Sequence, residues 1–312
     1  MEHFSWASPH ENVVQIFEIL DVAKCRPQIA EVADLQSSPI AIYAMELAMF
    51  SQRKFMLLRG GVVPLPMVRH LLQGTLGGVA HLHRNAFIHR DLKPDNILMC
   101  LEATTGRLVP KIADLGSVQT ADNARTRGVC TPHYRAPELF REVVKASLDA
   151  AGRASSDAAA KMPTKYGGEV DVWSCGVIAA ELLLGRHPWL FAEEDWPTVF
   201  AAIAAKLGRP GGAKVPLMVG VSAQEMVAGG MWKDDAAARR PLKDIPAQAR
   251  ELVTKMCRWR HATRIPLINK AFHFSVLYPI RCHCSGLDPT IFHFSEDPDE
   301  IWHTAVLPGS RG

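Results

Sequence analysis

The stretch FIHRDLKPDNIL, residues 87–98, decides the fold class of this chain. It places charged and amide side chains between two short apolar runs, a pattern typical of a loop that joins two strands. Asp91, Lys93 and Asn96 supply a carboxylate, an ammonium group and an amide within six positions. A second carboxylate, Asp114, follows in KIADLG at residues 111–116.

These side chains suit the transfer of a phosphoryl group. That reaction needs metal-held phosphates, an aligned hydroxyl group and positive charge where the transition state spreads its negative charge. Asp91 would orient or deprotonate the hydroxyl group, and Lys93 would lie beside the transferred phosphate. Asn96 and Asp114 offer the oxygen ligands that Mg²⁺ prefers.

Composition excludes several other classes. The 312 residues are 48% hydrophobic, which is enough for a packed globular core, and the formal charge of +3 gives no reason to expect a nucleic-acid or membrane partner. No secretory signal or apolar run of ~20 residues is visible. The seven cysteines are an odd number and widely scattered, which favours reduced thiols and a cytoplasmic or nuclear location.

The hydrophobic pattern predicts secondary structure around the central stretch. Residues 66–83 carry apolar side chains at spacings of three and four, as an amphipathic helix requires, and residues 170–185 read as a buried helix that closes at Gly185. Strands are expected within residues 10–24, 39–47, 86–88, 96–101 and 107–113.

The order of the motifs resembles that of eukaryotic protein kinases. HRDLKPDN at residues 89–96 matches their catalytic loop, and DLG at residues 114–116 is similar to their DFG motif, with Leu115 in place of Phe. APE follows at residues 136–138. In that family, Asp171 of DVWSCG would brace the catalytic loop.

The resemblance implies an α+β, protein-kinase-like fold with a truncated small β lobe and a mainly α-helical large lobe. Residues 1–48 would be the rest of the small lobe: the end of a helix, two strands and the hinge. Residues 49–278 would form the large lobe with an insertion at about 143–165, and residues 279–312 an irregular tail. Within the large lobe, Arg264 would pair with Glu138.

The implied activity is transfer of the ATP γ-phosphate to protein hydroxyl groups. Asp91 would be the base, Lys93 the charge stabiliser that also contacts ATP, and Asn96 with Asp114 the Mg²⁺ ligands. Lys93 two residues after Asp91 is typical of the Ser/Thr-specific kinases. By register, Met45 would be the gatekeeper and Glu46 to Ala48 the hinge that binds adenine.

Residues 126–138 resemble the cyclin-dependent and mitogen-activated kinases most, because Arg135 directly precedes APE. Thr126 stands at the position of an activating phosphorylation site, and Arg90 would supply part of its cationic pocket. Thr131 would hydrogen-bond the catalytic Asp and Lys. The implied partners are a protein substrate and a regulatory protein subunit.

The same resemblance predicts a glycine-rich loop and a phosphate-binding lysine before residues 10–14, where only residues 1–9 stand. Lys24 follows that point and is interpreted as a solvated strand-end residue. Two alternatives to an active enzyme therefore stay open: a catalytically impaired kinase-like scaffold or binding module, and a chain from an incomplete gene model or splice product. Cys282, Cys284 and His293 are interpreted as tail residues rather than a Zn²⁺ site.

Overall fold

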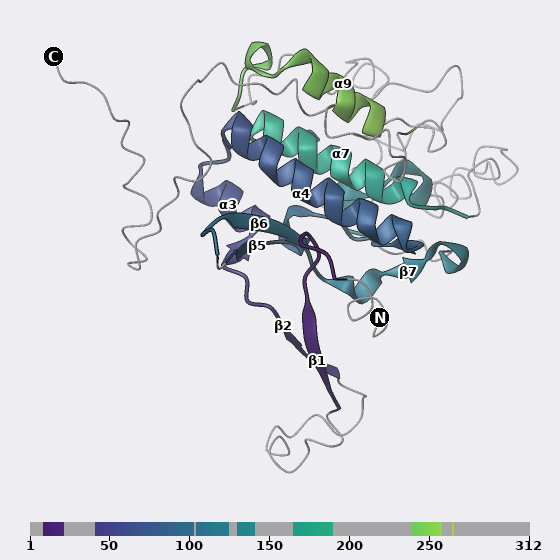
Figure 1. Ribbon diagram of the computed structural model, residues 1–312. Coiled ribbons are helices and arrows are strands. Elements are labelled where there is room, and N and C mark those ends of the chain that lie inside the picture. Colours follow the sequence, from purple (N-terminus) through teal and green to yellow (C-terminus); the bar gives the residue numbers. More distant parts are fainter. Residues whose placement is uncertain are drawn as a thin grey trace, which may run out of the picture.

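The computed structural model (Figure 1) describes residues 9–21, 41–102, 104–124, 130–140, 165–189, 239–257 and 264. The helices are α3 (Gln52–Leu58), α4 (Leu65–Arg84), α7 (Glu169–Leu184) and α9 (Ala247–Met256). The strands are β1 (Ile16–Asp21), β2 (Ala41–Met45), β3 (Phe50–Ser51), β4 (Phe87–Ile88), β5 (Ile97–Leu101), β6 (Leu108–Ile112) and β7 (Gln119–Thr120). The 3-10 turns are η1 (Pro94–Asn96), η2 (Leu115–Ser117), η3 (Ala121–Asn123), η4 (Pro132–Tyr134), η5 (Pro137–Phe140) and η7 (Leu242–Asp244).

Helix α4 follows the apolar stripe predicted for residues 66–83 and extends one residue further at each end. Its glycines serve close packing. A Cβ atom at Gly74 would lie 2.4 Å from Cγ of Pro110, and one at Gly78 would lie 2.4 Å from the carbonyl oxygen of Asn12. The segment after His10 and strand β6 therefore pack directly on the helix, at positions where a larger residue would clash.

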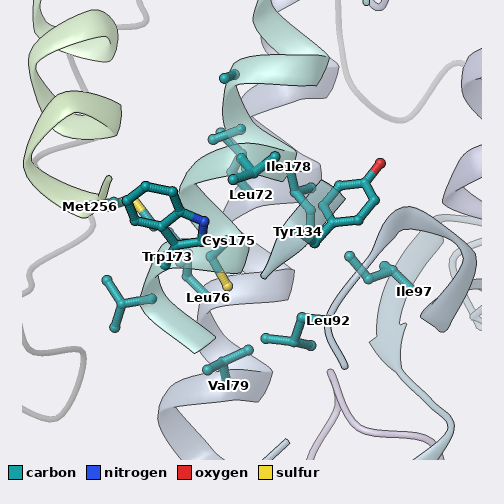
Figure 2. Packing of buried hydrophobic residues seen from close by; sticks show 14 of the residues in the cluster. Leu72, Leu76, Val79, Leu92, Ile97, Tyr134, Trp173, Cys175, Ile178 and Met256 are labelled. Atoms are coloured by element: carbon teal, nitrogen blue, oxygen red, sulfur yellow. The ribbon is translucent and has the colours of Figure 1, made fainter. Parts of the chain in front are cut away.

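Helix α7 is the buried helix predicted for residues 170–185. Nearly all its side chains are buried, and Gly185 ends it in a left-handed conformation with φ of 73°. Figure 1 shows α7 between α4 and α9. Trp173 and Trp189 are 0% and 1% exposed with ring centroids 5.9 Å apart, so both indoles belong to the core. In Figure 2, Trp173 lies beside Met256 of α9.

The predicted pair between Arg264 and Glu138 is present and buried. The guanidinium contacts both carboxylate oxygens, Nη1 at 2.5 Å and Nη2 at 2.8 Å, and its carbon atom lies 5.0 Å from the centre of the Trp173 ring. Arg264 also donates to the backbone oxygen of Glu169 at the start of α7. This contact joins the APE segment to the helical core.

Three small sheets accompany the helices in the described residues. Strands β3, β5 and β6 form one antiparallel sheet, β4 pairs with β7, and β1 pairs with β2. Strand β1 lies within the predicted residues 10–24 and begins at Ile16, because Asn12 and Val14 instead exchange backbone hydrogen bonds with Ile112 of β6. The β1–β2 hairpin therefore projects from the sheet that lies against α4 (Figure 1).

Several expectations fall outside the described residues: the insertion up to residue 164, the tail 279–312 and Lys24. Among the cysteines that the structure describes, Cys100, Cys130, Cys175 and Cys257 are free thiols, as predicted. None of the described helices has both the length and the apolar character needed to cross a membrane.

Gln52, the first residue of α3, is a local defect in the core. Its side chain is fully buried, and neither its amide nitrogen nor its amide oxygen has a hydrogen-bond partner. Burying an unpaired polar group costs about 1–3 kcal/mol. The side chain therefore lowers the stability of the region that follows the predicted hinge.

We expect Gln52→Leu to raise the free energy of unfolding by about 1–3 kcal/mol, because leucine fills a similar volume without an unpaired amide. Denaturant unfolding measures the change. Gln248→Leu on the exposed face of α9 is the matched control and should change stability by less than ~0.5 kcal/mol. A loss of stability in Gln52→Leu would show that the amide makes hydrogen bonds after all.

Candidate active site

The loop after β4 brings three predicted site residues together. Nζ of Lys93 lies 3.0 Å from Oδ2 of Asp91. The turn η1 then folds the chain back, so that Nδ2 of Asn96 donates to the backbone oxygen of Asp91 at 2.9 Å and to its Oδ2 at 3.2 Å. A carboxylate, an ammonium group and an amide thus share one small volume.

Asp114 reaches the same volume from the end of β6. Nδ2 of Asn96 lies 3.3 Å from Oδ2 of Asp114, so one amide contacts both predicted acids. The pairing of β5 with β6 brings Asp114 close to Asn96. The backbone nitrogen of Ala113 also donates to the backbone oxygen of Asn96 at 2.9 Å. Asp91 and Asp114 therefore lie in one site.

Thr131 completes the surroundings of Asp91. Its backbone nitrogen and its hydroxyl group donate to Oδ1 of Asp91 at 2.8 and 3.0 Å. Nζ of Lys93 donates to the same hydroxyl oxygen at 3.0 Å. The contact predicted for Thr131 with both residues is present. Thr131 holds Oδ1 of Asp91, while Lys93 and Asn96 contact Oδ2.

Three residues beside this site have an unusual backbone. Arg90, Asp114 and Cys130 have φ of 72°, 57° and 77°, a region that residues other than glycine rarely adopt. Each such residue costs of order 1–3 kcal/mol and persists only where surrounding contacts hold it. In the described residues only Ala86 shares this property among the non-glycine residues. The strain is therefore concentrated where the predicted chemistry lies.

Asp171 at the start of α7 holds the loop in this shape. Its Oδ1 accepts from the backbone nitrogen of Arg90, and its Oδ2 accepts from that of His89 and contacts Nε2 of His83, all at 2.8 Å. The side chain is fully buried. Although burial favours the neutral carboxyl, the hydrogen bond with His83 lowers the pKa of Asp171 below its usual value. The predicted brace is present as a buried, charged acceptor.

His89 extends this network toward Asp114. Its Nε2 lies 2.9 Å from the backbone oxygen of Ala113, the residue before Asp114. Arg90 is buried and donates to the backbone oxygen of Ser117 at 2.6 Å and to the hydroxyl group of Tyr166 at 3.3 Å. Thr126, its predicted phosphorylated partner, lies outside the described residues.

The predicted hinge lies between β2 and β3. Met45 is 42% exposed at the end of β2. The Glu46 side chain contacts other residues of the protein: it accepts a hydrogen bond from the backbone nitrogen of Gln15 and pairs with Lys111, both at 2.7 Å. Within the part of the chain that the structure describes, the backbone of Ala48 makes no hydrogen bond. Ala48 thus has a donor and an acceptor available for a ligand.

The donor set fits a magnesium ion bound together with phosphates. Mg²⁺ is usually held by one or two carboxylate groups plus phosphate oxygens and water, not by a complete protein cage. Asp114 offers a carboxylate, and Asn96 offers its amide oxygen, since its nitrogen makes the contacts to Asp91 and Asp114. Among the described residues no cluster of three or more His, Cys, Asp or Glu side chains could hold a metal without such help.

The turn η4 that follows Thr131 rests on an aromatic cluster. The ring of His187 packs edge-on against Tyr134 and His133, with centroids 5.1 and 5.4 Å apart, and the indole nitrogen of Trp189 donates to the His133 backbone at 2.9 Å. Burial, together with the neighbouring His133, lowers the pKa of His187 to about 3. His187 is therefore neutral near pH 7.

Two contacts of the site were missed from the sequence. His83 is the buried partner of Asp171, and Arg53 of α3 contacts Asp95 inside η1. In each case the partner lies more than 40 positions away in the sequence. Sequence spacing carries no signal for either contact.

Chemically, the arrangement can accept a proton at Asp91, stabilise developing negative charge with Lys93 and hold a divalent cation between Asn96 and Asp114. These are the groups that transfer of a phosphoryl group to an alcohol requires. The roles follow from geometry and residue type together.

Comparison with known proteins gives a consistent result. The family model described as "Protein kinase domain" matches residues 3–274. An SNF1-related protein kinase catalytic subunit, alpha KIN12, of Arabidopsis thaliana is 32% identical over 180 residues, which are 57% of this chain and 31% of that protein. The human calcium/calmodulin-dependent protein kinase type 1B is 31% identical over 178 residues, which are 57% of this chain and 45% of that protein.

Among solved structures, a chain of the yeast RNA Pol II CTD kinase CTDK-1 complex is similar, with a TM-score of 0.55 and 20% sequence identity. The match covers 84% of this chain and 74% of that one, and it shows the fold. The chain spans less than half the length of the curated relatives named above.

We expect Asp171→Asn to lower the free energy of unfolding by about 3–5 kcal/mol, because it removes a buried charge that pairs with His83 and accepts two backbone hydrogen bonds. Denaturant unfolding gives the value. Asp122→Asn, at an exposed position in η3, is the control and should be neutral. Equal stability of the two variants would contradict the bracing role of Asp171.

His187 predicts a pH dependence. Its folded pKa of about 3 lies below the usual 6.5, so between these values the unfolded chain binds a proton that the folded chain does not. The free energy of unfolding should therefore fall as pH falls, by about 1.4 kcal/mol per pH unit for this group. His187→Asn should show a shallower decline between pH 6.5 and 5 in urea unfolding. Identical slopes would rule out a neutral buried His187.

Proposed function

This chain belongs to the protein kinase family and is by family a protein serine/threonine kinase, and from that premise we propose that it transfers the γ-phosphate of ATP to hydroxyl groups of proteins. The observation that carries the proposal is the meeting of Asp91 and Asp114 at the amide of Asn96. Lys93 and Thr131 complete the set.

Asp91 is the proposed base. One of its carboxylate oxygens is fixed by Thr131 and the other contacts Lys93 and Asn96, so the carboxylate has a defined orientation toward an incoming hydroxyl group. Correctly placed general bases contribute ~10²–10⁴ in rate. Lys93 contacts Oδ2 of Asp91 and would stabilise the negative charge that develops on the phosphate.

Asn96 and Asp114 are the proposed ligands of Mg²⁺, which when bound would hold the β- and γ-phosphates and neutralise their charge. Asp114 is held by its left-handed backbone and by the nearby β5–β6 pairing, which favours a preformed ligand position. We propose Met45, Glu46 and Ala48 as contacts of the adenine ring. The backbone of Ala48, without a hydrogen bond in the described residues, supports this assignment.

Within the family, we place the chain near the cyclin-dependent and mitogen-activated kinases. Arg135, the residue that suggested this group, donates to the backbone oxygen of Cys130 at 2.5 Å, and Cys130 has φ of 77°. This contact supports a defined structure for the segment before Thr131. Phosphorylation of Thr126, recognised by Arg90, is the proposed regulation.

The proposed partners are a protein substrate and a regulatory protein subunit. The similar solved structure is described as a complex, which supports a subunit as partner here. A cytoplasmic or nuclear location remains part of the proposal and rests on the cysteine pattern of the sequence. Because the matched regions cover 31% and 45% of these curated relatives, the activity of the whole protein is proposed on the same terms.

We expect the chain to incorporate labelled phosphate from ATP and Mg²⁺ into a generic basic protein, and Asp91→Asn to lower the rate by ~10² or more. ATP with Mg²⁺ should also raise the melting temperature of the parent, since a ligand that binds the folded state stabilises it. Removal of Mg²⁺ with a chelator should abolish both effects.

Asp122→Asn removes an equivalent charge at an exposed position and should keep the parent rate. Labelling by the parent that does not exceed that of Asp91→Asn would contradict the enzymatic proposal for this chain. It would favour a kinase-like binding module.

A further inference from the structure

Helix α7 carries a carboxylate in an unfavourable place. Glu181 lies in the interior of this apolar helix and is only 4% exposed. Removing a charged carboxylate from water costs several kcal/mol unless a cation and hydrogen-bond donors compensate it. The partners of Glu181 therefore contribute to the stability of the fold.

Arg53 of α3 is the compensating cation. Its Nη1 lies 2.5 Å from Oε1 of Glu181, across 128 residues of sequence. Its Nη2 contacts the hydroxyl group of Tyr134, which donates in turn to Oε2 of Glu181 at 2.6 Å. The three side chains form a closed set in which each one contacts the other two.

The same guanidinium also reaches the catalytic loop. Its Nε lies 3.4 Å from Oδ2 of Asp95, which stands in η1 directly before Asn96. Tyr134 stands three residues after Thr131. Both segments that hold Asp91 are thus fastened to one planar group with fixed donor directions.

Charge and burial stabilise the contacts among Arg53, Tyr134 and Glu181. Burial opposes the charged form of Arg53, but Tyr134 and Glu181 raise its pKa above the usual value, and burial with the charge of Glu181 raises the pKa of Tyr134. The guanidinium stays cationic and the phenol stays a donor. Asp95 is 49% exposed, so its contact adds little energy but restrains the direction of η1.

We propose that Arg53 is a positioning residue that fixes the catalytic loop and the 131–134 turn relative to each other, and so places Asp91 and Asn96 for the transfer step. Arg53 does this through Asp95, Tyr134 and Glu181 and has no contact with Asp91 or Asn96 among its hydrogen bonds and ion pairs. The inference rests on the proposed function for its catalytic meaning. Its structural content can be tested without substrate.

The alternative is that Arg53 only neutralises Glu181. A neutralising cation would support global stability and leave both loops as ordered in the folded molecule as before. A positioning residue would in addition change local order in two separate segments. Hydrogen exchange resolves these segments, since the amides of Asn96, Thr131 and Tyr134 are all hydrogen-bonded in the folded chain.

The test compares Arg53→Met, Arg53→Lys and Lys54→Met by hydrogen-exchange mass spectrometry on the full 312-residue chain. Lys54→Met is the matched control, because it removes the same charge from the next, exposed position of α3. We expect Arg53→Met to speed exchange in residues 91–96 and 131–134 by about tenfold or more relative to α4 and α9, and Lys54→Met to leave both segments unchanged. Arg53→Lys keeps the positive charge but lacks the planar guanidinium with its fixed donor directions. It should therefore recover the melting temperature but not the exchange protection of residues 91–96 and 131–134.

Activity supplies the second readout. With the rate corrected for the folded fraction, Arg53→Met should lower kcat by ~10–10²-fold and leave the KM for ATP within about twofold, because small displacements of catalytic groups act on the transition state. A parent without phosphate transfer would contradict the proposed function alone, since exchange still decides the role of Arg53. Equal exchange in Arg53→Met and Lys54→Met, or full protection in Arg53→Lys, would overturn the positioning role.

Discussion

A single buried carboxylate gives the catalytic loop its shape. Asp171 is held in place by α7, and it accepts hydrogen bonds from two successive backbone nitrogens, those of His89 and Arg90. These two hydrogen bonds hold Arg90 in a left-handed conformation, from which the next residue, Asp91, contacts Thr131. The position of the proposed base is thus fixed by a charge that never contacts a substrate. His83 offsets the cost of burying the Asp171 carboxylate, because without His83 the buried charge would have no side-chain partner.

The core helix α7 carries a second carboxylate with a related task. Asp171 organises the loop from one end of the helix, and Glu181, ten positions further, receives Arg53 and Tyr134. Apolar packing supplies the rigid support, since Trp173 and Ile178 lie between these acids and are fully buried (Figure 2). The site is therefore built on a helix whose few polar residues face the loops. Rigid helices place such groups with more precision than loops do.

The sequence predicted the parts of the molecule that depend on local pattern. The apolar stripe of α4, the buried α7 and the loop that carries Asp91 follow from spacing, while the contacts of Thr131, Asp171 and Arg264 required the family resemblance as well. The remainder depends on tertiary distance. The start of β1 at Ile16 reflects the pairing of residues 12–14 with Ile112, and Arg53 was missed because its partner Glu181 lies 128 positions away. The roles proposed for the site residues stay predictions.

The junction between residues 12–14 and β6 has a mechanical consequence. The backbone of Ile112 accepts a hydrogen bond from Val14 and donates one to Asn12, and Ile112 is two residues before Asp114. The glycines of α4 let this junction pack closely on the helix. Because the β1–β2 hairpin begins two residues after Val14, a displacement of the hairpin would act through this junction on the strand that leads to Asp114, the proposed metal ligand.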